Sequence, residues 1–210
     1  QELNTNWYKM KIIKKGRPKT FNKQIAEKIA MQAYWREGMN NISLNEICRQ
    51  IGESKPSVYR EYGGEDGLKF SALKLYLDTR VNILSEYLFS EKPFIENLQS
   101  VFNYLINNHF DDENPYPCLY NKESWFPSKS MSMKCKNIVM EKDKEIAIKL
   151  KRHLKKAIEL NEIFIDIDID VCADYIHHQI KLIATLSNNK VSKDILNGMV
   201  HLIMRSLKKS

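Results

Sequence analysis

Apolar residues recur every three or four positions along most of the chain. This is the period of an amphipathic helix, so the sequence predicts an all-α protein. A first helix is expected after Asn22, ending near Gly38. Later helices are expected at about 65–88, 93–108, 129–160, 168–187 and 192–208, with a loop or short helix at 111–125.

One segment departs from the helical pattern. Residues 163–170 read IFIDIDID, which alternates with the period of a half-buried strand. No second strand is predicted that could pair with it, and a single strand cannot satisfy its own backbone groups. We therefore expect an extended connector that ends in an Asp N-cap.

Two short helices joined by a tight turn are predicted before residue 65. Ser43 and Glu46 form the pattern of a capping box at the start of the first helix. Gly52 suits the left-handed backbone of a sharp turn. Ser54 can cap the second helix, and Pro56 falls in its first turn, where a missing N–H costs little. This layout is that of a helix-turn-helix, whose second helix enters the major groove of DNA.

The positive charge is concentrated in the same part of the chain. The net charge is +7, and residues 1–63 hold 12 Lys and Arg against six Asp and Glu. A basic region of this kind favours polyanion binding through counterion release. The alternative is a solubility feature or a Lys-rich tail. The Gly16-Arg17-Pro18 step breaks any helix, so residues 1–19 are expected to form a basic, flexible arm.

From about residue 16 to residue 76, the chain resembles the tetracycline-repressor (TetR) family of bacterial regulators. The residues that carry this resemblance are Gly16-Arg17-Pro18, Tyr34-Trp35-Arg36-Glu37-Gly38, Ile42-Ser43-Leu44, Ile47, Gly52, Lys55-Pro56-Ser57-Val58-Tyr59, Tyr62, Leu68 and Leu73. The remaining two thirds of the chain match the family only in the number and length of the helices.

The resemblance implies an all-helical homodimer of about nine helices. It divides the chain into the arm at 1–19, a helix-turn-helix DNA-binding domain at 20–64, with the motif itself at about 42–61, and a helical effector-binding and dimerisation domain at 65–210. It also implies that a small molecule moves the long helix beginning near Glu65 and separates the two recognition helices.

Three acidic residues depart from the family pattern, at two places in the chain. Glu65 and Asp66 stand where the family often has a phosphate-contacting Lys, and Glu61 stands where an aromatic residue or His is common. Acidic groups suit the first turn of a helix, but they repel phosphate. They are read here as first-turn residues, with weakened or altered DNA binding as the alternative.

The second helix of the motif supplies most of the candidate DNA contacts. Lys55 can reach guanine acceptors. Tyr59 is expected to touch the DNA backbone, as the family's Tyr does, with a core position as the alternative. The basic arm could enter the minor groove. The predicted DNA-binding residues are Arg17, Lys19, Ser43, Ser54, Lys55, Ser57, Tyr59 and Arg60.

Two further sets of residues are assigned to the C-terminal part. Aromatic residues cluster between residues 94 and 126, which favours an apolar ligand pocket there, with plain core packing as the alternative. The candidate ligand-binding residues are Phe102, His109, Tyr120, Trp125 and Phe126. Apolar stripes on the last two helices could form a four-helix bundle with a second subunit, or belong to the core of one chain. The candidate interface residues are Ile176, Ile180, Ile183, Ile195, Met199 and Leu202.

The predicted function is a ligand-responsive repressor that leaves a palindromic double-stranded operator when a small molecule binds. An activator, a nonspecific DNA-binding protein and a family member with attenuated DNA binding are the alternatives. An enzyme is disfavoured, because no Ser-His-Asp order, P-loop, dinucleotide-binding turn or HExxH motif occurs. No catalytic residue, cofactor or metal is expected, and the four cysteines form no CxxC pair. No apolar run suits a membrane span or a signal peptide, so a cytoplasmic, nucleoid-associated bacterial protein is expected.

Overall fold

The computed structural model of the protein describes residues 21–108, 116–129, 131–163 and 168–207, and within these ranges it contains helices and no strand. The helices are α1 (Lys23–Glu37), α2 (Leu44–Ile51), α3 (Lys55–Tyr62), α4 (Glu65–Tyr76), α5 (Asn82–Leu88), α6 (Phe94–Asn108), α7 (Leu119–Trp125), α8 (Met133–Glu159), α9 (Ile169–Asn188) and α10 (Lys193–Ser206). A π-helical segment, η1 (Leu77–Val81), joins α4 to α5 into one long helix. Counted in this way, the described residues form nine helices, and the all-α prediction is confirmed.

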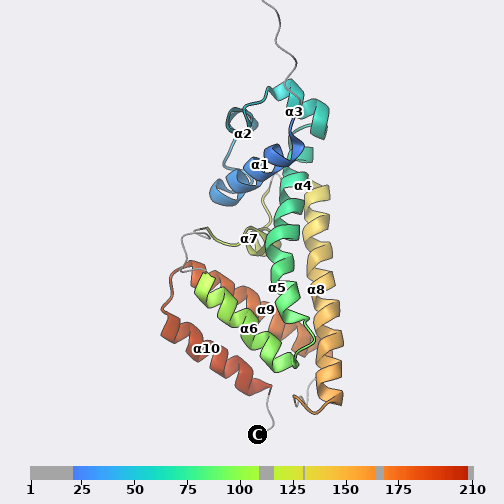
Figure 1. Ribbon diagram of the computed structural model, residues 1–210, viewed down its shortest axis with the longest axis vertical. Helices are drawn as coiled ribbons and strands as arrows, with labels where there is room; N and C mark the ends of the chain where they lie inside the picture. Colours follow the sequence, from blue (N-terminus) through green and yellow to red (C-terminus); the bar gives the residue numbers. More distant parts are fainter. Residues whose placement is uncertain (1–20, 109–115, 130, 164–167, 208–210) are drawn as a thin grey trace, which may run out of the picture.

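The molecule is elongated, with α1, α2 and α3 gathered at one end (Figure 1). We call these three helices (residues 21–62) the head and helices α4 to α10 (residues 65–207) the body. The long helix α4–η1–α5 leaves the head and runs beside α8, while α6, α9 and α10 pack at the far end of the body. Helix α7 lies between the head and α9 (Figure 1). Helix α1 packs mainly against α4, so the head rests on the start of the long helix.

Side-chain caps fix where most of these helices begin. Asn22, Ser43, Ser54, Asp168 and Ser192 each accept a hydrogen bond from a backbone N–H in the first turn of the helix that follows. These residues satisfy donors that have no partner inside the helix. The helix predicted to begin at about residue 129 is α8, which begins at Met133 because its cap is Ser132.

The capping box predicted at α2 forms only in part. The Ser43 hydroxyl accepts a hydrogen bond from the backbone N–H of Glu46 at 3.2 Å. The Glu46 carboxylate, however, accepts hydrogen bonds from Arg49 at 2.7 and 2.9 Å and from Gln50 at 2.9 Å. Arg49 and Gln50 lie one turn further along the same helix and hold the carboxylate there, away from the backbone of the cap.

Two glycines make the turns of the head. Gly52 ends α2 at φ 75° and ψ 29°, and Gly63 ends α3 at φ 72° and ψ 7°. Both angles lie in the left-handed region, which a residue with a Cβ adopts only at a cost. The short α2 and α3 can therefore fold back on α1 and α4.

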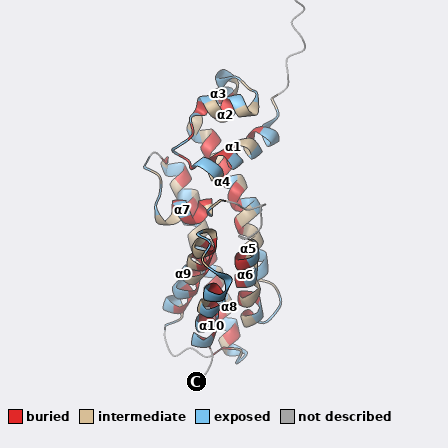
Figure 2. Cartoon of the chain, turned by 90° about the vertical axis from the view of Figure 1, so that its left-hand side faces the viewer, coloured by how far each residue is buried: buried red, intermediate tan, exposed pale blue. Residues whose placement is uncertain are grey.

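Buried residues form a continuous core from the head into the body (Figure 2). In the head it includes Tyr34, Ile47 and Val58, which are at most 1% exposed. In the body it includes the middle of α6 and the inner faces of α8 and α9. The described helices include none that is both long enough and apolar enough to cross a bilayer. Of the predicted connector at 163–170, residues 164–167 lie outside the described ranges.

Candidate DNA-binding surface and internal cavity

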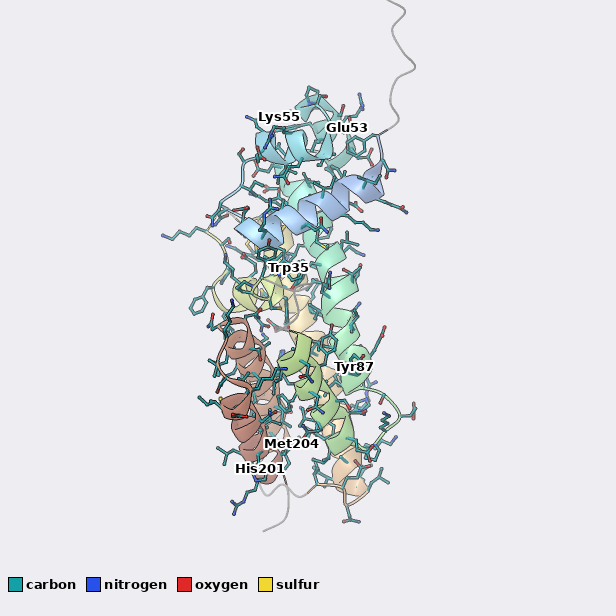
Figure 3. All side chains as sticks on the ribbon, turned by 60° about the vertical axis from the view of Figure 1, so that its left-hand side comes forward. Trp35, Glu53, Lys55, Tyr87, His201 and Met204 are labelled. Atoms are coloured by element: carbon teal, nitrogen blue, oxygen red, sulfur yellow. The ribbon has the colours of Figure 1, made fainter. Side chains whose placement is uncertain are left out.

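The outer face of α3 is polar and basic. Val58 packs inward and is completely buried, whereas Lys55, Tyr59 and Arg60 are exposed, with 49% of Tyr59 accessible. Figure 3 shows Lys55 at the tip of the head, farthest from the body. A cationic group and a phenol on one exposed helix face can contact the phosphates and base edges of DNA.

The serines of the motif hold its geometry. The Ser54 hydroxyl accepts a hydrogen bond from the backbone N–H of Ser57 at 3.3 Å and lies 2.9 Å from the Ser57 hydroxyl. Ser43 makes the equivalent bond at the start of α2. All three serines keep some exposure at the head surface. Arg17 and Lys19, the two predicted contacts from the arm, lie outside the described residues.

Ion pairs neutralise much of the acidic flank beyond α3. Glu61 lies 3.3 Å from the ammonium of Lys23 on α1. Glu65 lies 2.7 Å from the ammonium of Lys69, one turn further along α4. Two of the three carboxylates that depart from the TetR pattern therefore carry a cation within the protein, which weakens their repulsion of a phosphate.

The body contains a cavity of about 90 Å³ between the long helix, α6, α7 and α9. Its walls are mainly apolar and aromatic. Representative wall residues are Tyr76, Leu84, Tyr104, Leu105, Ile146 and Ile180. A concave, mainly apolar space with a few polar groups is the usual form of a small-molecule site.

A partly buried ionic cluster lies at one end of this cavity and includes two of its wall residues, Tyr120 and Lys181. The Lys181 ammonium donates to Asp143 Oδ1 at 2.5 Å and to the Ser124 hydroxyl at 2.8 Å. Asp143 also accepts hydrogen bonds from the hydroxyls of Tyr120 and Ser124. Burial alone would raise the pKa of Asp143, but these hydrogen bonds, Lys181 first among them, hold it below its ordinary value. The carboxylate therefore stays charged and anchors α7 and α9 to α8.

His177 lies beside this cluster and is only 6% exposed. Its Nε2 atom has no hydrogen-bond partner and lies 3.7 Å from Asp143 Oδ1, beyond hydrogen-bonding distance. Burial, together with the nearby Lys181 charge, lowers the pKa of His177 to about 4. The imidazole is therefore neutral at neutral pH and offers one unpaired nitrogen to the cavity.

Trp35 connects the head to this cavity. It comes from α1, and its indole N–H donates to the carbonyl of Pro117 at 2.9 Å. Its ring packs edge-on against Tyr76 at 5.4 Å and Tyr116 at 5.9 Å, and the Arg80 guanidinium lies 5.1 Å from its centre. All five residues except Pro117 line the cavity. Figure 3 shows Trp35 on the side of α1 that faces the body. A molecule in the cavity would therefore touch the head directly.

The cavity includes one of the five residues predicted to bind a ligand. Tyr120 lines it. Phe102 is completely buried in the core on α6, and Phe126 is 77% exposed after α7, so neither lies at its wall. Trp125 is half-buried outside it, and His109 lies outside the described residues.

The sequence reading missed His177 and Lys181, although a signal for them exists. Both occupy the buried face of α9, four residues apart, among Ile176, Ile180 and Ala184. Polar residues at core positions of an amphipathic helix require partners or a ligand. The next residue, His178, is exposed, and the centres of the two imidazole rings lie 5.9 Å apart.

The predicted dimer residues divide into two groups. Ile176, Ile180 and Ile183 are 0%, 9% and 0% exposed, because α9 turns this face toward the other helices of its own chain. These three belong to the core of one subunit, which corrects their assignment to an interface. Ile195 and Leu202 on α10 are 58% and 65% exposed. Val171 and Tyr175 on the outer face of α9 are 58% and 38% exposed. Met199 on α10 is half-buried.

Neither metal ligands nor a disulfide mark the described residues. The described ranges contain no group of three or more His, Cys, Asp or Glu side chains placed to hold a metal ion. All four cysteines are unpaired, and burial raises the pKa of Cys118, the one at the cavity wall. Its thiol is therefore mainly protonated at neutral pH.

No family model matches the chain. It is 29% identical over 105 residues to the HTH-type transcriptional repressor ComR of Escherichia coli, a match that covers 50% of each chain. The matched segment thus spans about half the length of this curated relative.

Similarity to solved structures extends further along the chain. The TetR family transcriptional regulator CifR, in a cysteine-mutant form complexed with 26-base-pair operator DNA, matches 91% of this chain and 100% of its own at 19% identity, with a TM-score of 0.78. FadR of Bacillus subtilis in complex with stearoyl-CoA matches 89% of this chain and 100% of its own at 15% identity, with a TM-score of 0.66. The chain therefore has the fold of the TetR family of transcriptional regulators, and part of its sequence is similar to that of an HTH-type transcriptional repressor.

Proposed function

We propose that this protein is a ligand-responsive, DNA-binding transcriptional regulator, and specifically a repressor that leaves its operator when a small molecule occupies the cavity. One observation carries the proposal: the head presents a basic helix to solvent, and Trp35 of the same head forms part of the cavity wall. A ligand that prefers one position of Trp35 would bias the position of α3 through the helices that join them.

The relatives support both parts of this proposal. ComR is a repressor, CifR has been solved with operator DNA, and FadR with stearoyl-CoA. An activator that uses the same two sites is the alternative. We also propose that the protein is not an enzyme and acts in the bacterial cytoplasm, where its DNA would be.

The DNA contacts proposed for the head are those of the outer face of α3. Lys55 and Arg60 would reach bases or phosphates, and Tyr59 would contact the sugar-phosphate backbone. The capping serines Ser43 and Ser54, together with Ser57, would add hydrogen bonds from the edge of the motif. The predicted arm, with Arg17 and Lys19, would complete the surface by entering the minor groove.

We propose a homodimer formed through the outer faces of α9 and α10. Val171, Tyr175, Ile195 and Leu202 are exposed apolar residues on these two helices, and a four-helix bundle with the same faces of a second subunit would bury them. A two-fold axis would place the two copies of α3 on successive major grooves of a palindrome, about 34 Å apart.

The test is a selection of binding sites from random double-stranded DNA with the full chain, followed by titration of the selected site. We expect a palindromic site that binds at least about 10³-fold more tightly than bulk DNA, with affinity that falls steeply as salt rises. A matched sequence with one half-site scrambled serves as the control. Equal affinity for selected and random DNA would reject a sequence-specific regulator.

A further inference from the structure

We infer that the cavity takes a small molecule with an apolar body of about one ring and one hydrogen-bond-accepting oxygen group, and that His177 and Lys181 bind this oxygen. This inference rests on the proposed function, because it treats the cavity as the effector site. It adds the chemical class of the effector and the two side chains that select it.

The size of the cavity limits the body of the ligand. A water molecule occupies about 30 Å³ of liquid, and an apolar cavity of about 150 Å³ in a protein interior can hold benzene. The cavity here measures about 90 Å³, and its partly exposed wall residues Tyr104 and Tyr116 leave room for a modest expansion. A single ring or a short aliphatic chain, packed against Leu84, Leu105 and Ile146, is therefore the upper limit for the apolar body of the ligand.

The unpaired nitrogen of His177 points to a polar group on the ligand. More than nine tenths of this side chain is buried, and its Nε2 has no partner among the described residues. Buried polar atoms in folded proteins almost always have a partner, because leaving one unpaired costs free energy. Its place at the cavity wall makes a bound molecule the natural partner.

Lys181 supplies a second donor at the same end. Its ammonium has three N–H groups, and Asp143 and Ser124 accept hydrogen bonds from it. The ammonium also lies 4.9 Å from the centre of the Tyr120 ring, another wall residue. One N–H of Lys181 is therefore left to donate to an oxygen in the cavity, beside the neutral imidazole of His177.

The charges of the wall exclude a cationic headgroup. The ionised side chains that line the cavity, within the described part of the chain, are Arg80 and Lys181, both cations. Asp143, the carboxylate paired with Lys181, is not a wall residue and already accepts three hydrogen bonds, from Tyr120, Ser124 and Lys181. An acceptor oxygen, on a carboxylate or on a neutral carbonyl, can accept from the Lys181 ammonium and from the Nε2–H tautomer of His177 without bringing a positive charge next to them.

Binding of four single-ring compounds to the full chain, measured by isothermal titration calorimetry without DNA, tests the inference. Benzoate carries an anionic acceptor, acetophenone a neutral acceptor, toluene no acceptor and benzylamine a cation. We expect benzoate or acetophenone to bind at least ten-fold more tightly than toluene and benzylamine. Which of benzoate and acetophenone binds more tightly identifies whether the headgroup is anionic or neutral. Toluene or benzylamine binding as tightly as both acceptors, or no binding by any of the four, would overturn the inference.

Substitutions at His177 test which residue makes the contact. His177→Leu replaces the imidazole with an apolar side chain of similar volume. We expect it to weaken binding of the tighter-binding acceptor compound at least ten-fold. His177→Gln keeps a hydrogen-bonding group and should retain an intermediate affinity. The control is His153→Leu, because His153 packs against Phe89 at 4.9 Å on α8, away from this cavity. Unchanged affinity in His177→Leu would overturn the assignment, and thermal unfolding of each variant confirms that it is folded.

Operator binding by the same preparations separates this inference from the proposed function. If the protein binds its selected operator but none of the four compounds, the effector class is wrong and the regulator stands. If the acceptors bind at His177 but no specific DNA site exists, the cavity chemistry stands and the regulator is wrong.

Discussion

The head and the body use their polar side chains in opposite ways. In the head, Lys55, Tyr59 and Arg60 face solvent, and the buried residues are almost all apolar. In the body, the most distinctive polar groups, Lys181 and His177, are 4% and 6% exposed and surround a cavity. A surface of the first kind suits a large polyanion, whose charges stay hydrated at the rim. An interior of the second kind suits a molecule small enough to be enclosed.

The head and the body also differ in how much free energy is lost when a charged group loses its partner. A charged group at the surface can lose its partner at little cost, whereas a buried one cannot. Substitutions in the head should therefore change what the protein binds, and substitutions in the body should change whether it stays folded. The following expectations test this division, from the largest effect to the smallest.

Lys181→Met should have the largest effect on stability. It leaves Asp143 without its cation in a partly buried position, and we expect the free energy of unfolding to fall by about 3 kcal/mol in urea denaturation. Lys74→Met is the matched control, because Lys74 pairs with Asp78 at 2.9 Å on an exposed face of α4. That change should cost no more than about 0.5 kcal/mol. Similar losses in the two variants would remove the distinction between buried and exposed pairs.

Acid should destabilise the body through His177. Its pKa is about 4 in the folded protein, against an ordinary value of 6.5, so the unfolded chain binds more protons between these values. The stability contributed by the neutral imidazole is present above pH 6.5 and is lost as the pH falls toward 4, by about 3 kcal/mol in total.

Urea denaturation between pH 7 and pH 4 measures this loss. His177→Leu should flatten that part of the pH profile, and at pH 5 it should be more stable than the parent protein. A parallel decline in both proteins would show that other groups cause it.

Lys55→Ala and Tyr59→Ala should each weaken operator binding by about 1–3 kcal/mol, the scale of a specific contact. Both side chains are exposed, so the unfolding temperature should stay the same. Fluorescence anisotropy with the selected operator measures the effect, and Lys144→Ala on the exposed face of α8 is the control. Full affinity in both variants would mean that α3 does not read the DNA.

Ser54→Ala should lower the free energy of unfolding by about 1 kcal/mol, because it removes the cap of α3. Unlike the other head substitutions, it should reduce both stability and operator affinity, since α3 loses its fixed start. Ser192→Ala removes the equivalent cap of α10, and its loss of stability should leave operator affinity unchanged. Thermal unfolding and operator-binding anisotropy, measured on the same samples, distinguish Ser54→Ala from Ser192→Ala.

The head could be predicted almost completely because its determinants are local. Ser43, Gly52 and Ser54 act within three or four residues of their own positions, so the sequence displays each cap and turn directly. The cavity depends on contacts between distant residues. Trp35 bonds to Pro117 across 82 positions, and Lys181 bonds to Asp143 across 38. Periodicity identifies a buried face but not which helix will cover it, so the aromatic cluster near Trp125 was a natural but incomplete choice.

The π-helical segment in the long helix has a consequence for the shape of the cavity. The backbone N–H of Asn82 bonds to the carbonyl of Leu77, five residues back, which inserts one extra residue into the turn. Tyr76, Arg80, Leu84 and Leu88 all line the cavity, although they recur every four residues. In a regular helix this spacing would rotate the last residue about 120° away from the first, at about 100° per residue. The surplus residue reduces the offset to about 20°, so a single wide turn keeps the same face of the helix toward the cavity over three turns.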